Sequence, residues 1–426
     1  MLTWLGPVPY LVVTDPQTTQ DILTSPHCVN KATIYNVFED NAGIGLINLK
    51  DKQWSTHRKL LNPIVGFEML QGFQSVFNRE TDGLLEKLDK LVNDGEKDLS
   101  LLVQMFTLDM GIENIMCVGT NEKKDYDSKI MVQHLIRISQ TSTDMALCPW
   151  LRNRTIRQIL GKEKRYADAK SGLREFLKKM IKQKLDKDNA ANQPSAVTES
   201  NKYINLSTDL LKRGIFSSKN VEDEAFIILF AIFDTSANSL IYTLMLLAMF
   251  PVCQEKVFQE LKSLFPENGV FEVTFASTHE MVYLDMVMNE CFRLFSPAPI
   301  VFREASQDIR LSNGVIIPKG LQIAIDIFHM QRSKTIWGPD AETFNPDHFL
   351  PANMQDIHPY AFIPFTKGIR YCLGTKYAMT SLKVTLAKIL RKYKFSTSMK
   401  FEDLHYTEQI TLGLKTTPLF ELQRRY

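Results

Sequence analysis

The sequence lacks the features that identify several classes of protein. It has no long basic block and a net charge of only +2, which argues against a nucleic-acid binder. No linker rich in proline, glycine and serine interrupts the 426 residues, so we expect one domain over residues 1–426. There is no nucleotide-binding glycine loop either. If the chain carries out a redox reaction, its electrons must therefore come from another protein.

Cysteine is sparse and its spacing is irregular. Because the spacings match no disulfide framework, we expect reduced thiols. No pair of cysteines or histidines has the spacing of a separate metal site. Hydrophobic residues make up 44% of the chain and charged residues 23%, which predicts a globular protein with a large core. The six cysteines are Cys28, Cys117, Cys148, Cys253, Cys291 and Cys372.

The N-terminal residues contain neither a signal peptide nor an apolar anchor of about 20 residues. Residues 10–14 (YLVVT) predict a strand, and Asp15 followed by Pro16 predicts the start of a helix. Further along the chain, residues 186–202 are polar and predict a loop between two helices.

One apolar segment, residues 226–250, is long enough to be a membrane span. It has 25 residues and a single charged side chain, Asp234. Polar side chains, however, cluster between positions 234 and 239, where burial in hydrocarbon would cost most. We therefore predict a buried core helix that carries a polar, functional turn.

Residues 365–374 (FTKGIRYCLG) place one cysteine in surroundings that suit a metal-bound thiolate. Gly368 and Gly374 allow the backbone to fold tightly around Cys372, and Arg370 adds a positive charge. Apolar residues recur at helical spacing directly afterwards, so the cysteine should lie just before a helix whose dipole favours an anion. A thiolate offered alone suits haem, which already brings four ring nitrogens to its iron.

This segment resembles the haem-binding signature of the cytochrome P450 superfamily: Phe, two residues, Gly, one residue, Arg, one residue, Cys, one residue, Gly. The matching residues are Phe365, Gly368, Arg370, Cys372 and Gly374. The resemblance implies a mainly α-helical fold with small β-sheets, and a haem whose iron is ligated axially by Cys372. Phe365 and Arg370 would also contact the cofactor. Segments such as SPHCVNKATIYN are most similar to the insect branch allied to fatty-acid omega-hydroxylases. The alternative is that Cys372 is a small buried hydrophobe.

The polar turn AIFDTSANS is similar to the distal haem helix of this family, where an acid and a threonine handle oxygen and protons. Asp234 and Thr235 would be this catalytic pair. A hydroxyl can donate, accept and hold one water, so Thr235 can position a proton relay that Asp234 connects to solvent. The alternative is that Thr235 bonds back to a carbonyl of its own helix and that Asp234 pairs with a lysine.

The chain also departs from the family at this turn. The usual glycine two residues before the acid is replaced by Ile232, which predicts crowding where oxygen approaches. Ala231 stands where some related hydroxylases have a glutamate that becomes ester-linked to haem, so that link is excluded.

Two further elements resemble those of the family. Glu290 and Arg293, at i and i+3 on one helix, match the Glu-x-x-Arg pair that braces the cysteine loop. His348 stands where a second arginine usually completes this cluster, so the brace is expected to be weaker or sensitive to pH.

Buried haem propionates need cationic partners. Trp54 and Arg58, at i and i+4, resemble the propionate-binding helix, and Arg303 resembles the arginine that reaches the other side of the haem. The alternatives are core packing for Trp54 and a surface ion pair for Arg58.

The resemblance implies a haem-thiolate monooxygenase that inserts one oxygen atom from O2 into an apolar substrate and reduces the other to water. The implied partner is NADPH-cytochrome P450 reductase, which would meet basic residues near Lys367 and Lys376, and cytochrome b5 is a further candidate donor. Two alternatives remain open. One is a haem-thiolate isomerase or dehydratase, and the other is a non-enzymatic haem or lipid binder in which Ile232 has closed the oxygen pocket.

Substrate and location follow from the same resemblance. Fatty acids, insect hormones and foreign apolar compounds, insecticides included, suit a pocket lined by residues 226–233, 298–301 and the loop near 411–413. Membrane-bound members carry an anchor before a segment like WLGPVPYLVVTDP, so we expect this chain to begin after it. Either the sequence is incomplete, or the protein attaches peripherally to the cytosolic face of the endoplasmic reticulum or microsomal membrane.

Overall fold

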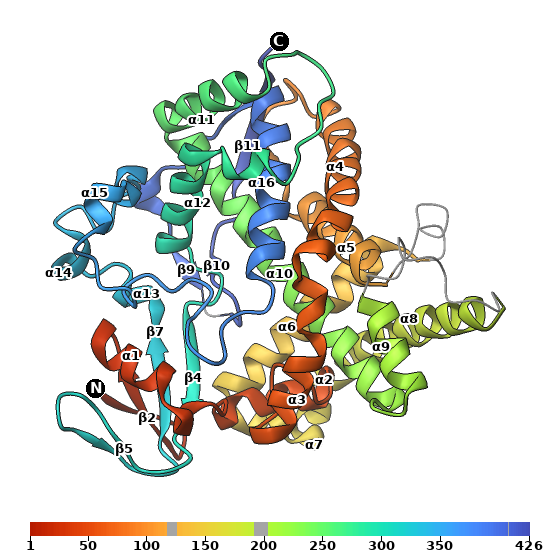
Figure 1. Cartoon of the computed structure of the whole chain (residues 1–426), viewed down its shortest axis with the longest axis vertical. Coiled ribbons are helices and arrows are strands. Elements are labelled where there is room, and N and C mark those ends of the chain that lie inside the picture. Colours follow the sequence, from red (N-terminus) through yellow and green to blue (C-terminus); the bar gives the residue numbers. More distant parts are fainter. Residues whose placement is uncertain (117–125, 191–202, 408) are drawn as a thin grey trace.

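The computed structural model of the chain describes residues 1–116, 126–190, 203–407 and 409–426. It is mainly helical with several small sheets, which confirms the predicted class (Figure 1). The helices are α1 Pro16–Thr24, α2 Val37–Asn41, α3 Asp51–Leu61, α4 Phe67–Asp89, α5 Ser100–Met116, α6 Ser128–Leu147, α7 Arg154–Ile159, α8 Glu163–Ala190, α9 Tyr203–Lys212, α10 Ser218–Met249, α11 Pro251–Leu264, α12 Val282–Leu294, α13 Ile327–Met330, α14 Lys334–Trp337, α15 Pro351–Met354 and α16 Thr375–Lys392.

The strands are short, and within the described residues they form four small sheets. The largest has the order β1-β2-β7-β4, in which β2 and β7 are parallel and the other neighbours antiparallel. The strands are β1 Leu2–Leu5, β2 Val8–Val13, β3 Lys97–Asp98, β4 Ile300–Glu304, β5 Ile309–Arg310, β6 Ile316–Ile317, β7 Gln322–Asp326, β8 Tyr393–Ser396, β9 Tyr406–Thr407, β10 Gly413–Leu414 and β11 Leu419–Arg424.

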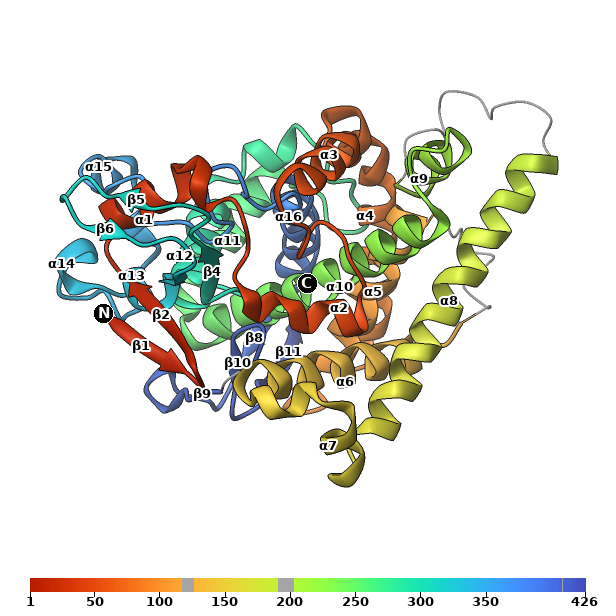
Figure 2. The same ribbon diagram turned by 90° about the horizontal axis from the view of Figure 1, so that it is seen from below.

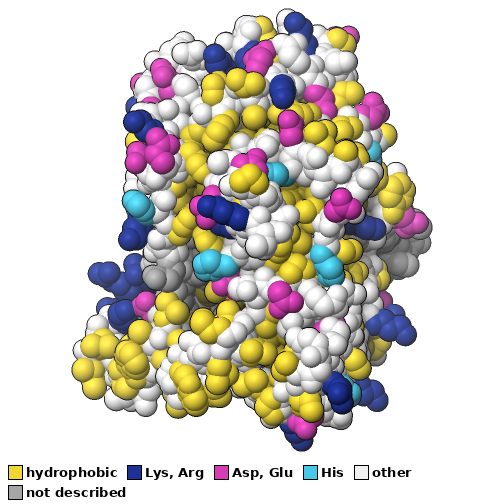
Figure 3. Space-filling view, turned by 90° about the vertical axis from the view of Figure 1, so that its left-hand side faces the viewer, with side chains coloured by type: hydrophobic (Ala, Val, Ile, Leu, Met, Phe, Trp, Pro, Cys, Tyr) yellow, Lys and Arg dark blue, Asp and Glu magenta, His cyan; other side chains and the backbone are white. Residues whose placement is uncertain are grey.

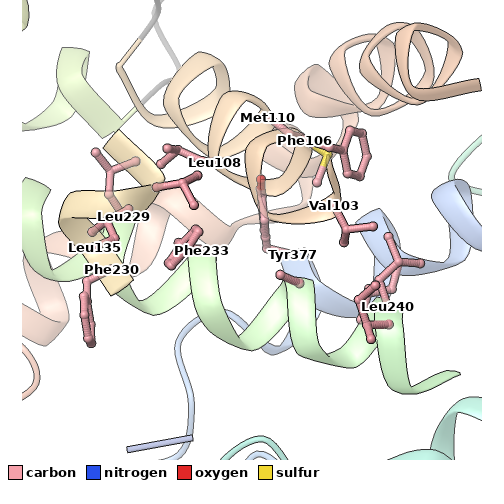
Figure 4. Close-up of a cluster of buried hydrophobic side chains, with 14 of the residues drawn as sticks. Val103, Phe106, Leu108, Met110, Leu135, Leu229, Phe230, Phe233, Leu240 and Tyr377 are labelled. Atoms are coloured by element: carbon pink, nitrogen blue, oxygen red, sulfur yellow. The ribbon is translucent and has the colours of Figure 1, made fainter. Parts of the chain in front are cut away.

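Helix α10 runs through the middle of the molecule, with α5 and α16 against it (Figures 1 and 2). Its side chains are buried along most of its length, as the 226–250 segment predicts. Figure 4 shows Phe233 of α10 close to α5, whose Phe106 and Met110 belong to the same buried cluster. By length and composition α10 is the one helix of the described chain that could cross a membrane, but 72% of its most apolar stretch is buried within the protein. Protein packing therefore accounts for its hydrophobicity.

Local sequence signals placed several elements correctly. Residues 10–13 of the predicted strand lie in β2, which begins at Val8 and ends at Val13. Asp15 caps α1, because its carboxylate accepts a hydrogen bond of 2.8 Å from the Thr18 amide. The helix expected after the cysteine motif is α16, which ends at Lys392.

The predicted loop over 186–202 is wrong at its start. Residues 186–190 form the last turn of α8, and the structure describes nothing from 191 to 202. Cys117, for which we predict a reduced thiol, also lies outside the described residues. The five described cysteines are free thiols, as expected.

Candidate functional site

The loop that carries Cys372 is held by its own backbone. The Cys372 amide donates a hydrogen bond of 2.9 Å to the Phe365 carbonyl, and the Tyr371 amide donates one of 3.2 Å to the Gly368 carbonyl. Gly368 has a φ of 74°, and a β-carbon there would collide with the carbonyl oxygen of Leu23. Glycine is therefore required at 368, and the loop places Cys372 three residues before α16.

Gly374 bears out one part of its predicted role: its amide points at the Cys372 sulfur, but its backbone does not require glycine. Its φ of −81° is open to any residue, and a β-carbon would lie 3.9 Å from the Cys372 sulfur, which is an ordinary contact. Its contribution is the backbone amide, which with the Arg58 guanidinium and the Thr375 hydroxyl acts to lower the pKa of the thiol. Burial outweighs these groups and raises the pKa of Cys372. Because Cys372 is open to the cavity, a metal cation bound there would favour the thiolate form of the sulfur.

Cys372 faces a cavity of about 350 Å³, and it is the only described cysteine in the cavity wall. The wall is mostly apolar and includes residues of α10, the loop before α3, and the cysteine loop. Phe365 also lines the cavity, and its ring lies edge-to-face on that of Phe292 at 5.4 Å. Trp54 and Arg58 enter the same wall from α3, so the structure brings these two predicted residues together with Cys372.

Arg370 lines the cavity, and backbone carbonyls outside the cavity wall or at its edge fix its side chain. Its guanidinium donates to the carbonyls of Val29, Leu46 and Leu49 at 2.9, 3.3 and 2.6 Å, and it stacks 4.3 Å above the Trp54 ring. Burial, followed by repulsion from Arg303, lowers the pKa of Arg370 to about 9. Arg370 therefore ties the cysteine loop to the chain before α3 and also leaves a positive charge at the cavity.

Positive charge accumulates here without neutralisation. Among the described residues, no carboxylate forms an ion pair with Lys31, Arg58, Arg303 or Arg370. Burial lowers the pKa of Lys31 and of Arg303, and repulsion between the cations adds to the shift of Lys31. Arg58 and Arg303 each have one buried Nη2 with no hydrogen-bond partner. Buried donors of this kind require an acceptor, so the cluster fits a ligand that carries carboxylates, as the two propionates of haem do.

Two details differ from the sequence prediction. Arg303 is 1% exposed and stands behind the cavity wall, beside Lys31 and Arg370, instead of lining it. Lys31 does line the cavity, 3.3 Å from the Tyr35 hydroxyl, and sequence reasoning missed it. No local pattern marks Lys31, because its role depends on Arg303 and Arg370, which lie 272 and 339 positions further along the sequence.

Comparison with known proteins decides the family. The family model described as Cytochrome P450 matches residues 1–422. The chain belongs to the cytochrome P450 family. Members of this family are haem-thiolate monooxygenases, with the haem iron ligated by a cysteine.

The relatives of this cytochrome P450 include several insect proteins, as the sequence predicted. "Probable cytochrome P450 313a4" of Drosophila melanogaster is 54% identical over 426 residues, which are 100% of this chain and 86% of that protein. "Probable cytochrome P450 313a1" of the same organism is 39% identical over the same shares. "Cytochrome P450 4c3", also from Drosophila melanogaster, is 29% identical over 97% of this chain and 79% of that protein.

The polar turn of α10 in this cytochrome P450 faces two directions. Thr235 lines the cavity with Cys372, and its hydroxyl donates a hydrogen bond of 2.6 Å to the Ala231 carbonyl one turn earlier. Asp234 lies outside that cavity wall, and its carboxylate accepts a hydrogen bond of 2.5 Å from the Thr411 hydroxyl. Thr235 therefore makes the hydrogen bond to its own helix that the alternative predicted. Asp234 does not pair with a lysine of the described chain, as that alternative expected, but with Thr411.

The predicted pocket is divided into two cavities. Residues 411 and 412 line a second cavity of about 390 Å³, together with Pro299, Ile300 and Thr143. Tyr35 lines both cavities, and its ring lies 6.3 Å from that of Phe302. A side chain from the segment before α2 thus stands between the spaces that the sequence had assigned to one pocket.

Ile232 lines the first cavity beside Ala231 and Thr235, as the family departure predicted. One of its branches also packs against α5: a β-carbon placed on Gly111 would lie 3.1 Å from Ile232 Cγ2. The small residue at 111 therefore makes room for the isoleucine that replaces the usual glycine.

We expect Ile232→Gly to enlarge the cavity beside Thr235 and to raise product formed per NADPH consumed. It should also cost about 1 kcal/mol of helix stability through backbone freedom, plus lost packing on α5. Gly111→Ala should lower the product formed per NADPH consumed, because the added methyl group pushes Ile232 toward the cavity. The two variants and the wild type are compared in product per NADPH and in melting temperature, and equal coupling in all three would contradict the obstruction.

The predicted brace is present and fully buried. The Arg293 guanidinium donates to both carboxylate oxygens of Glu290 at 2.7 Å, and both side chains are 0% exposed. His348 completes the cluster, with Nδ1 3.1 Å from Glu290 and Nε2 3.3 Å from Asp340. The hydrogen bond with Glu290 raises the pKa of His348.

This raised pKa predicts that the brace weakens in alkali. The charge on His348 stabilises the folded state fully below its unfolded pKa of about 6.5. That stabilisation is lost as the pH rises through the higher folded value. We expect melting temperature and haem retention to fall over this interval, and His348→Arg to remove the dependence because its charge is permanent. A wild type and a His348→Arg variant with parallel pH profiles would contradict this.

Proposed function

We propose that this chain is a haem-thiolate monooxygenase of apolar substrates in which Cys372 ligates the iron. The observation that carries the proposal is the meeting of Cys372 with three cations, the half-buried Lys31 and Arg58 and the buried Arg370, in one apolar cavity. A haem-thiolate protein needs both a cysteine ligand for the iron and partners for the propionates. Trp54 and Phe365 would pack against the macrocycle, and Arg303 would add charge from behind the wall.

The bound haem would supply oxygen activation, and the chain supplies the surroundings. The apolar side chains of α10 and of residues 297–301 exclude water and favour a substrate without charge near the reacting atoms. Thr235 offers a hydroxyl at the cavity surface that can release the Ala231 carbonyl and donate a proton inward. Asp234, on the other side of the helix, would restore that proton.

The second cavity supports a long apolar substrate such as a fatty acid, an insect hormone or a xenobiotic. Its wall is largely apolar, and it adjoins the first cavity at Tyr35. The polar side chains at its wall include Asp326 and His329, which pair with each other at 2.7 Å. A molecule that passes Tyr35 could occupy the first cavity and the apolar part of the second, and leave the polar side chains around Thr411 to water.

Electrons would come from NADPH-cytochrome P450 reductase, with cytochrome b5 as a further donor. Lys376 is exposed at the start of α16, and Lys367 lies in the cysteine loop. Both residues are close in sequence to Cys372, so an acidic partner that docks there would approach the thiolate side of the site.

A peripheral position at the endoplasmic reticulum membrane is supported by exposed apolar side chains. Trp4 of β1 is 64% exposed, and Trp150 and Ile159, between α6 and α8, are 60% and 79% exposed. The two regions meet, since a β-carbon on Gly6 would lie 3.6 Å from Pro149. Figure 3 shows hydrophobic side chains gathered along the lower edge of one face of the molecule.

The experiment that tests this function is turnover by the haem-loaded protein with reductase, NADPH and a panel of fatty acids, hormones and insecticides. We expect product that contains one added oxygen atom and requires both NADPH and O2. Conversion of an already oxygenated substrate without reductase would instead support an isomerase or dehydratase. Haem binding without any turnover would support a binding protein.

A further inference from the structure

The acid of the α10 turn is connected to the second cavity. Asp234 accepts from the Thr411 hydroxyl at 2.5 Å, and Thr411 lines the second cavity. The Asn238 amide lies 3.2 Å from the Thr411 oxygen and 3.5 Å from Asp234, which closes a ring of three polar side chains. No cation of the described chain pairs with Asp234, so these two residues are its side-chain partners.

The Thr411 hydroxyl is not needed to hold its own loop. The Ile410 amide donates to the Thr143 hydroxyl at 3.1 Å, and the Leu412 amide donates to the Pro297 carbonyl at 3.0 Å. The Tyr242 hydroxyl donates to the Leu412 carbonyl at 2.7 Å. Both neighbours of Thr411 are therefore fixed independently, and its hydroxyl is left to serve Asp234.

Thr235 and Asp234 are adjacent in sequence and so point to different faces of α10. Thr235 faces the cavity of Cys372, and Asp234 faces away from it. A proton that leaves Asp234 toward Thr235 must be replaced from the face of α10 on which Asp234 lies, where Thr411 is the described group that touches both the carboxylate and a cavity wide enough for water.

We propose that Thr411 is a positioning residue that joins Asp234 to water in the second cavity and so supplies protons to the α10 turn. This inference rests on the proposed monooxygenase function. In the step, the Thr411 hydroxyl proton passes to Asp234 Oδ2. At the same time Thr411 Oγ1 takes a proton from a hydronium ion in the second cavity, which becomes water. Thr411 ends neutral, the carboxylate becomes a carboxylic acid, and no electron is transferred.

The test compares Thr411→Val, which keeps the shape but loses the hydroxyl, with Thr411→Ser, which keeps the hydroxyl. With one accepted substrate, product per NADPH should fall about tenfold in Thr411→Val, less than the ~10²-fold typical of removing a proton donor itself. Thr411→Ser should restore most of it. The solvent isotope effect on turnover, measured in H2O and D2O, should rise in Thr411→Val only.

A second readout does not depend on turnover. Infrared spectra are recorded over a range of pH, and the carbonyl stretch that Asp234 acquires on protonation is identified as the band lost in Asp234→Asn. The frequency of this band should change in Thr411→Val and should have its wild-type value in Thr411→Ser and in Thr143→Val. Thr143→Val is the matched control, because it removes a threonine hydroxyl from the same loop contact without touching Asp234.

Three outcomes would overturn the proposal. The first is a Thr411→Val variant that forms as much product per NADPH as the wild type while Asp234→Asn forms less. The second is a Thr411→Ser variant that is as impaired as Thr411→Val. The third is a carbonyl band that does not shift in Thr411→Val. If the wild type gives no product with any substrate, the proposed function fails, and the infrared band alone then decides whether Thr411 controls the proton of Asp234.

Discussion

Replacement of Cys372 by alanine is expected to abolish the thiolate absorption of the reduced, carbon-monoxide-bound protein and to release most of the haem. Cys372 is the one described cysteine that reaches the cavity, so no other described thiol can replace it. The cations of Arg58 and Arg370 would still attract the propionates, but haem without its axial ligand is held only by these contacts. The measurement is the reduced carbon-monoxide spectrum together with the haem-to-protein ratio after gel filtration.

The matched controls are alanine at each of the other five cysteines. Cys28 and Cys291 are buried, and burial raises the pKa of each thiol to about 12, so they are structural. The variants of Cys28 and Cys291 should lose some stability through packing, and all five variants should keep the thiolate spectrum. A normal spectrum in Cys372→Ala, or its loss in one of the controls, would sink the assignment of the ligand.

The parts of the fold that the sequence predicted are those with a local cause. Hydrophobic spacing placed α16, and a buried apolar run with a polar centre placed α10 in the core. Asp15 before Pro16 marked the start of α1 because an N-cap and a first-turn proline act within three residues. The Glu290–Arg293 pair met as expected since i and i+3 share a helix face.

What the sequence could not predict depends on contacts between distant segments. The raised pKa of Cys372 results from burial, which neighbouring residues in the chain do not determine. Asp234 could not be assigned to Thr411, which lies 177 positions away. The single expected pocket became two because Tyr35 intervenes. Each of these follows from packing, and periodicity carries no information about which elements meet.

The second large effect is expected at the brace, where Arg293→Gln should leave the chain unable to retain haem. Arg293 also donates to the carbonyls of Gln331, Ala341 and Thr343, at 2.7, 2.5 and 3.1 Å, so one side chain joins α12 to the segments that precede the cysteine loop. Removing one partner of a buried pair costs about 3–5 kcal/mol, because the other charge stays buried. A typical domain has only about 5–15 kcal/mol of net stability. Melting temperature and haem content report the loss.

Arg391→Gln is the control that separates a buried charge from lost hydrogen bonds. Arg391 is 1% exposed and donates to the carbonyls of Phe265, Pro266 and Glu267, but it has no carboxylate partner among the described residues. It should be the milder variant, because only neutral acceptors lose their donor. In the Arg293→Gln background, Glu290→Gln should recover part of the stability, because it removes a buried carboxylate whose remaining charged partner among the described residues is His348. Equal losses in Arg293→Gln and Arg391→Gln, with no recovery in the double variant, would show that hydrogen bonds to the backbone hold the brace and that its ion pair does not.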